Sequence, residues 1–312
     1  VFYGIVYALL ENDMRRILAY SIVNQVGFMI VGIGIGTEMA LNGAAAHAFT
    51  HIIYKALLLM SAGSVLLMTK RRKCSELGGL FHSMPLTTVC GTIGALAISS
   101  FPLTSGFVSK SMVSQSAADG QLLWVWLGLT AASAGVFLHA GIKFPWFVFF
   151  QKDSGLRPAE PPASMRWAMV FFAFLCIAMG VWAEPLYALL PYAVNYVPYT
   201  GAHVLTQLQL LLFSGLAFFV MLPWLKRTPT LTLDTDWLWR RAGPALWRGL
   251  RQGYAGARAA VARPVKAVGQ GVLDAVERTH GQEGRLARTW ATRSMALWVM
   301  VLLLGYLALY YL

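Results

Sequence analysis

The chain has 312 residues, of which 57% are hydrophobic and only 12% are charged, and its mean hydropathy is +0.59. Soluble domains are about half apolar and about a quarter charged, so the composition excludes a soluble protein and indicates an integral membrane protein. The net charge of +12 does not point to nucleic acid, because the basic residues lie between apolar runs rather than beside exposed stacking aromatics.

Six apolar runs are long enough to cross the membrane, since a helix needs about 20 residues to span about 30 Å of hydrocarbon. The alternating pattern of a membrane barrel is absent, so these runs predict helices. The first ten residues are apolar but too short to span, and we expect them to be the end of a helix that begins earlier. The six runs lie at about 17–36, 41–68, 122–150, 167–191, 202–225 and 293–312.

Basic residues divide the connections between these runs into two sets. They occur at 15–16, 70–73, 152–166 and from 226 to 293, whereas the connections near Glu38, Asp119 and 192–201 contain none. The positive-inside rule places the first set in the cytoplasm. All the basic connections fall on one side only if 85–118 crosses the membrane once.

A single crossing of 34 residues is too long for a straight helix, so 85–118 is expected to be discontinuous. Pro102 and Gly106 mark the expected break, with Lys110 beside it near mid-span. Broken backbone at membrane depth is tolerated where it lines a wet cavity, and it is typical of ion-transport sites. The alternative is a simple proline kink with Lys110 reaching towards the membrane surface.

Three titratable residues share one stripe of the run at 41–68. His47, His51 and Lys55 are spaced i, i+4 and i+8, and such groups inside hydrocarbon normally face a bundle interior or a water-filled path. A proton relay is therefore favoured over ordinary core packing. Zinc binding is disfavoured because no third ligand lies nearby and Lys55 would repel a cation.

His139 and Lys143 repeat the i, i+4 spacing near the cytoplasmic end of their run, so they are candidates for an exit path to water, with snorkelling as the alternative. The cysteines show no metal or redox spacing. No nucleotide-binding loop or paired catalytic carboxylates are visible either, so we expect no cofactor, no metal site and no intrinsic enzyme activity.

Three stretches carry a family resemblance: NDMRRILAYSIVNQVGFM, HAFTHIIYKALLLM and LGGLFHSMPLTTVCGTIGALAISSFPLTSGFVSKSMV. They closely resemble the antiporter-like subunits shared by multisubunit Mrp-type cation/proton antiporters and the proton-pumping membrane arm of respiratory complex I. Among these, the chain looks most like the D-type members of the Mrp group. The resemblance runs from about residue 1 to residue 230.

The resemblance implies a fold of two inverted five-helix repeats, each with a broken helix, joined by a hydrated polar axis at the bilayer midplane. His47, His51 and Lys55 match the central relay of the family, and Lys110 matches its broken-helix lysine at the exit half-channel. Ser111 and Gln25 depart from it, standing where other members have an acidic residue and a histidine.

The resemblance covers only the second repeat and a tail, so a truncated or partial chain is expected. The chain is then a truncated reading frame, a fragment of a longer subunit or a half-protein completed by another polypeptide, and its start inside an apolar run favours truncation.

Three domains are predicted: a second-repeat transmembrane part (1–230), a basic amphipathic segment lying in the membrane interface (231–290) and a last span (291–312). The middle segment is expected to break near Pro244 and Pro264. A lateral helix that bridges neighbouring subunits and a solvated basic linker are both consistent with it.

The sequence thus predicts an all-α polytopic membrane bundle in the inner (plasma) membrane. Its expected role is that of a proton-translocating subunit of a multisubunit Na⁺(cation)/H⁺ antiporter, working with other membrane subunits and handling H⁺, with Na⁺ as the candidate coupled cation. One alternative is a proton-pumping subunit of a complex I-like or hydrogenase-like oxidoreductase, which would bring a translocase label. The other is a structural subunit that transports nothing.

Overall fold

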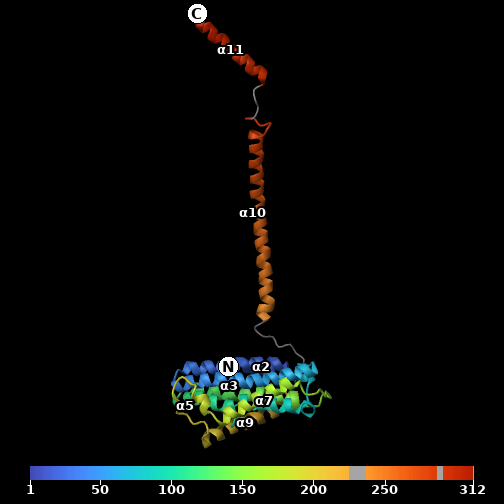
Figure 1. Cartoon of the computed structure of the whole chain (residues 1–312), viewed down its shortest axis with the longest axis vertical. Coiled ribbons are helices and arrows are strands. Elements are labelled where there is room, and N and C mark those ends of the chain that lie inside the picture. The colour runs from blue at the N-terminus through green and yellow to red at the C-terminus, as the bar shows by residue number, and fades with distance from the viewer. Residues whose placement is uncertain (225–236, 287–290, 312) are drawn as a thin grey trace. The chain divides into compact units, whose positions relative to one another are not determined.

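The computed structural model describes residues 1–224, 237–286 and 291–311, which form helices and connecting loops (Figure 1). Within these ranges no strand occurs, and the one β-bridge joins Asp13 and Lys73. The all-α prediction is confirmed. The chain divides into two compact units, 1–232 and 233–312, and each is described by itself.

Six described helices are long and apolar enough to span a membrane, in agreement with the six predicted runs. A shorter helix, α1 (Phe2–Leu10), precedes them. The six candidate spans are α2 (Met14–Ile35), α3 (Glu38–Thr69), the continuous helix Leu123–Phe150, α7 (Ala163–Val181), α9 (Gly201–Met221) and α11 (Thr292–Tyr311). The helix Leu123–Phe150 consists of α6 (Leu123–Val136), η3 (Phe137–Lys143) and η4 (Trp146–Phe150).

One predicted boundary is wrong. The run at 167–191 was expected to span as a whole, but α7 ends at Val181 and a separate short helix, α8 (Glu184–Tyr187), follows. The physical reason is Pro185, which lies in the first turn of α8. Proline fits the start of a helix but removes a hydrogen bond and clashes inside one, so apolar composition alone overestimated the length of the span.

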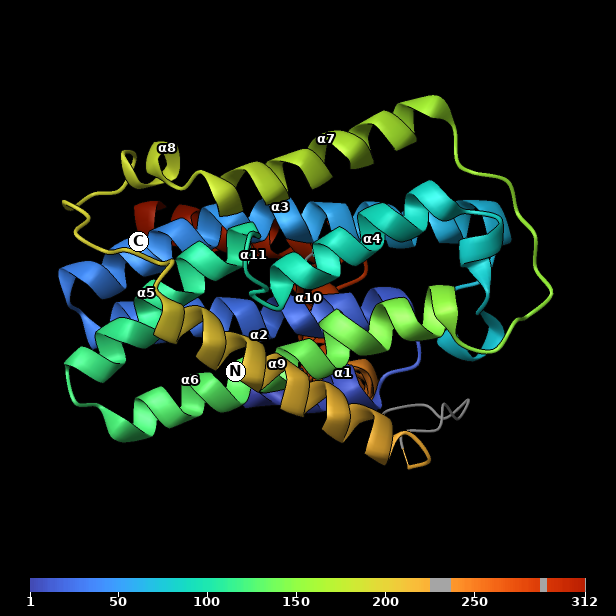
Figure 2. The same ribbon diagram turned by 90° about the horizontal axis from the view of Figure 1, so that it is seen from below.

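The basic connections of the first unit gather at one end of the helix bundle, the right-hand end in Figure 2. The backbone N–H of Met14 donates to Arg72 O at 3.0 Å, and Ser154 Oγ donates to Gly78 O at 2.8 Å. At the other end Asn42 Nδ2 donates to Tyr192 O at 2.9 Å. The bundle therefore has one basic end and one end where those connections lack lysine and arginine.

The discontinuous helix is present where it was predicted. It consists of α4 (Pro85–Ile98) and α5 (Ser105–Asp119), which follow each other across the bundle in Figure 2. Pro102 lies in the six-residue break between them. Gly106 is already inside α5, so the break is centred slightly earlier than the two residues suggested.

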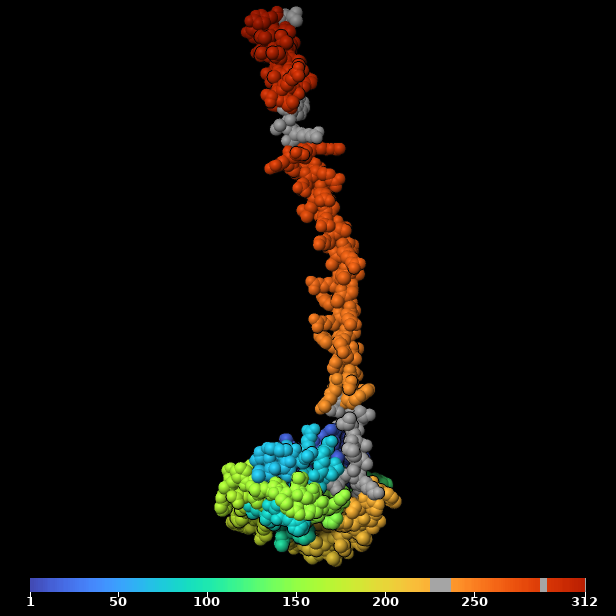
Figure 3. Space-filling model, turned by 90° about the vertical axis from the view of Figure 1, so that its right-hand side faces the viewer, coloured from blue at the N-terminus to red at the C-terminus, as the bar shows by residue number. Residues whose placement is uncertain are grey.

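The second unit contains η5 (Leu238–Ala242), α10 (Gly243–His280) and α11, and none of the residues in these helices is buried. Figure 3 shows α10 as one long rod with side chains projecting along its length. Its strong amphipathic pattern leaves a long apolar stripe beside a basic face. Parts of the predicted interfacial segment (231–236 and 287–290) and the end of the last predicted span (Leu312) lie outside the described residues.

The predicted break at Pro264 is wrong, because α10 continues through it. Proline removes one backbone hydrogen bond, but alanine, which has the highest helix propensity of any residue, is frequent in the surrounding turns. Pro244, in turn, lies in the first turn of α10, where proline is well tolerated.

Candidate functional site: a buried polar axis beside a helix break

The three stripe residues of α3 all lie inside the first unit. His47 is fully buried, and His51 and Lys55 are 7% and 3% exposed. The ring centroids of His47 and His51 are 6.2 Å apart. Their i, i+4, i+8 spacing keeps them on one face of α3, which packs against α2, α4, α5 and α7.

His47 is held by polar side chains from two other helices. Its Nε2 donates to Gln25 Oε1 of α2 at 2.9 Å, and its Nδ1 lies 3.2 Å from Ser109 Oγ of α5. Tyr54 OH donates to the same Gln25 oxygen at 3.1 Å. Because a carbonyl oxygen only accepts, this arrangement leaves Nδ1 of a neutral His47 ring as the acceptor for the Ser109 hydroxyl.

Lys110 lies at the other side of this cluster, where the discontinuous helix is interrupted. Its Nζ donates to Ile98 O at the end of α4, at 2.8 Å, and lies 5.6 Å from the centroid of the Phe28 ring. A cation at the C-terminal end of a helix is favoured by the helix dipole. The broken helix therefore supplies the binding partner for its own lysine.

The backbone of the break is strained. Ser100 and Leu103 have φ values of 58° and 68°, a region that residues other than glycine rarely adopt. A Cβ added to Gly106 would lie 1.9 Å from Ala97 O, so only glycine lets α5 begin this close to the end of α4. Strained residues of this kind cluster at functional sites.

The predicted exit residues occupy the π-helical stretch η3. His139 is fully buried, and its Nδ1 lies 2.7 Å from Gly135 O. Lys143 Nζ donates to three carbonyl oxygens at the end of α1, those of Ala8, Leu9 and Glu11, at 3.0, 2.5 and 2.6 Å. This set of partners supports an anchoring role for Lys143.

Several buried atoms of this axis have no hydrogen-bond partner among the described residues. They include His51 Nε2, Lys55 Nζ and His139 Nε2. Lys55 follows His51 by one turn on the same face of α3. Buried polar atoms are normally paired with protein or water, so these three atoms are candidate points for water to bind along the axis.

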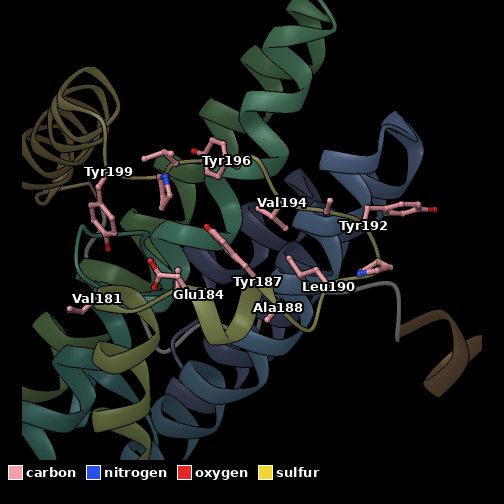
Figure 4. A pocket seen from close by; sticks show the side chains of 14 residues that line it. Val181, Glu184, Tyr187, Ala188, Leu190, Tyr192, Val194, Tyr196 and Tyr199 are labelled. Carbon is pink, nitrogen blue, oxygen red and sulfur yellow. The ribbon is translucent and has the colours of Figure 1, made fainter.

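The end of the bundle without basic connections is covered by the loop after α7. Tyrosines and Glu184 from this loop line a cavity of about 630 Å³ (Figure 4). Tyr187 OH donates to Val108 O of α5 at 2.8 Å, which ties the loop to the helix that carries Lys110. Burial raises the pKa of the Tyr187 phenol above its usual range, so its hydroxyl remains a donor at neutral pH.

Sequence reasoning placed the titratable residues in one region but missed the polar groups that orient them. Gln25 was singled out only as a departure from the family, and Tyr54 was not singled out. The available signal was that Gln25 is a polar residue in an apolar span, and that Tyr54 follows His47 by seven residues, on the same face of the helix. In the described ranges, no three His, Cys, Asp or Glu side chains come together as a metal site.

With this geometry, the first unit is a polytopic helical bundle built around a buried polar axis. Residues 1–137 match the family described as "NADH:quinone oxidoreductase/Mrp antiporter, TM". The chain is 32% identical over 185 residues to a probable K⁺/H⁺ antiporter A/B subunit of Rhizobium meliloti, covering 57% of this chain and 18% of that protein. It is 38% identical over 128 residues to the L subunit of the NADH-quinone oxidoreductase of Escherichia coli, covering 40% and 20%.

A solved structure shares the fold. The membrane-bound sulfane sulfur reductase, an archaeal respiratory membrane complex, contains a chain that matches with a TM-score of 0.58 and 21% identity, covering 98% of this chain and 54% of that one. Together the sequence matches confirm the resemblance to Mrp/complex I-like, antiporter-type membrane subunits. The chain spans about a fifth of the length of the two curated relatives, and its assignment to the D-type group stays a prediction.

Proposed function

We propose that the chain moves protons through the membrane as part of a multisubunit Na⁺(cation)/H⁺ antiporter in the plasma membrane. His47, His51, Lys55 and Lys110 are the groups that pass the proton, with Gln25 and Ser109 orienting His47. The observation that carries the proposal is the row of buried titratable side chains that ends at Lys110, whose ammonium group binds Ile98 O across the strained break between α4 and α5.

The chemistry of lysine suits this role. A buried lysine can release and recapture a proton, whereas arginine stays charged. Lys110 has one carbonyl partner and an aromatic face, so the neutral amine, which keeps two N–H donors, can still donate to that carbonyl after its proton has left. We expect α10 to lie in the membrane interface beside neighbouring subunits, with its arginines towards anionic headgroups.

The second candidate is a proton-pumping subunit of a complex I-like or hydrogenase-like oxidoreductase. The identity to the NADH-quinone oxidoreductase L subunit favours it, because that relative is the more similar of the two over its matched length. The two candidates use the same side chains and differ in the source of energy. An imposed cation gradient drives the antiporter, and electron transfer in a partner drives the other.

Proton flux in sealed vesicles that contain the chain in its native assembly tests the proposal. We expect Lys110→Ala to lower flux by about a hundredfold, the scale of a positioned proton-transfer group, and Lys110→Arg to be equally inactive. Lys152→Ala is the matched control, because Lys152 is exposed at the basic end. Full flux in Lys110→Ala identifies a structural subunit, and flux that persists when choline replaces Na⁺ excludes sodium as the coupled ion.

A further inference from the structure

A second polar cavity connects Lys110 with helix α9. It has a volume of about 660 Å³ and lies between α5, α6 and α9. Serine, threonine and glutamine side chains make up much of its lining, and it is large enough to hold several waters. The titratable side chains among its lining residues are Lys110 and His203.

Helix α9 presents one polar face to this cavity. His203, Gln207, Leu210 and Ser214 follow the i, i+4, i+7, i+11 spacing of a single helix face, and all four line the cavity. His203 belongs to the first turn of α9, next to Thr200, whose side chain caps the helix. It therefore lies at the end of the bundle opposite the basic connections.

Gln207 links this face to the helix break. Its Nε2 donates to Ser99 O at 3.2 Å, while Lys110 donates to the preceding carbonyl, Ile98 O, at 2.8 Å. Two side chains from different helices thus bind consecutive carbonyls at the end of α4. His203 lies one helical turn from Gln207, about 6 Å along α9.

His203 is also held in a defined orientation. Its ring stacks on Phe107 of α5 with centroids 4.5 Å apart, and its Nδ1 lies 2.7 Å from Pro198 O. Because the carbonyl only accepts, Nδ1 carries the hydrogen and the neutral ring keeps its lone pair at Nε2. The ring is half-buried, so part of it is accessible at the surface of the first unit.

We propose that His203 exchanges protons between the Lys110 cavity and the solution at the end of the bundle without basic connections. The inference rests on the proposed function and adds a residue and a route to it. A proton leaves the Lys110 ammonium for water in the cavity, His203 Nε2 accepts it from that water, and the imidazolium releases it to the solution. The route runs along α9, away from His139 and Lys143.

The test compares variants of His203 in proteoliposomes that hold the full chain in its native assembly. His203→Ala is expected to lower proton flux by about ten- to a hundredfold. His203→Asn keeps a donor for Pro198 O but has no proton-accepting nitrogen, so it should be equally slow although it folds. His82→Ala is the matched control, since His82 is exposed at the basic end.

Chemical rescue separates proton exchange from a structural role. Carnosine is a membrane-impermeant imidazole buffer. Adding it on the side of the membrane where His203 lies should restore flux in His203→Ala at least several-fold. A sulfonate buffer that covers the same pH range should not restore it. Full flux in His203→Ala or His203→Asn, or a loss that carnosine does not restore, overturns the inference. If Lys110→Ala loses flux while the His203 variants keep it, the proposed function stands and this route fails; if Lys110→Ala keeps flux, both fail.

Discussion

Two buried lysines each donate to carbonyl oxygens at the end of a helix, but they differ in the number of carbonyls they bind. Lys143 binds three carbonyl oxygens at the end of α1, which satisfies all three hydrogens of its ammonium group. Lys110 binds one carbonyl at the end of α4 and lines a polar cavity. Between them, Lys55 has no hydrogen-bond partner among the described residues.

The difference shows that burial and charge alone do not define a transport residue. An ammonium group with three carbonyl partners is stabilised in its charged form, because the neutral amine has only two N–H donors and would leave one of the three buried acceptors unpaired. A lysine with one partner or none, next to space for water, loses little when it releases a proton. Under the proposed function, a lysine with three fixed partners is expected to be an anchor, and a lysine with one partner or none is expected to be a proton carrier.

Replacing Lys55 and Lys143 separately is the most direct test of this difference between the lysines. Lys55→Met should lower proton flux by about a hundredfold and leave thermal stability unchanged or higher, because no protein hydrogen bond is lost. Lys143→Met should cost about 2 kcal/mol of stability, since three carbonyls lose a charged donor, and should keep most of the flux per folded molecule. Vesicle flux and thermal unfolding in detergent measure the pair. A flux loss in Lys143→Met equal to that in Lys55→Met would return Lys143 to the exit path.

The contact between α4 and α5 can be changed without touching a lysine. Gly106→Ala places a methyl group where Ala97 O now lies, so α5 must move, at a cost of about 3 kcal/mol and with loss of flux. Gly128→Ala is the control, because Gly128 is helical and a Cβ there meets nothing within 4 Å. It should be neutral or gain about 1 kcal/mol. Normal flux in Gly106→Ala would show that the position of Lys110 on Ile98 O is unimportant.

The loop over α5 offers a smaller change near Lys110. Tyr187→Phe removes the hydrogen bond to Val108 O and should cost about 1 kcal/mol, with a modest fall in flux. The loss should not vary with pH around neutrality, because burial raises the pKa of the Tyr187 phenol and keeps it protonated. Tyr254→Phe, at an exposed position of α10, is the control for unfolding measurements.

The smallest expected effect concerns an exposed ion pair at the basic end. Hydrogen bonds from Arg157 and from the N–H of Gly155 hold the pKa of Asp153 below its usual range. A carboxyl group whose pKa is lowered in the folded state stabilises the fold at pH values above its ordinary pKa of 3.8. This stabilisation is lost as the pH falls below 3.8. Asp153→Asn should therefore flatten the acid limb of a stability–pH curve slightly and leave flux unchanged. An unaltered acid limb would show that the pair contributes nothing.

Much of the fold could be predicted because apolar length and proline position act locally. The spans, the interruption near Pro102 and the stripe of His47, His51 and Lys55 all follow from spacing within one segment. The end of α7 was missed because apolar residues continue past Val181, although Pro185 was a usable signal.

The site's supporting contacts were out of reach for a different reason. Gln25, Ser109 and Gln207 come from three different helices. A single polar residue in an apolar helix forms no sequence pattern from which its partner could be predicted. The carbonyls bound by Lys143 lie more than 130 residues away in the chain. Only the packing of the helices reveals which lysine is saturated and which is not.

The π-helical stretch that carries His139 and Lys143 has a mechanical consequence. Each wide turn holds one residue more than an α-helical turn, and releasing that residue rotates the helix on one side of it by about 100° against the other side. Relaxation of the stretch Phe137–Lys143 to α-helical geometry would therefore turn the side chains on one side of it by that angle relative to the side chains on the other. A force applied to the lipid-facing side of this helix would then change which residues its inward-facing side chains contact.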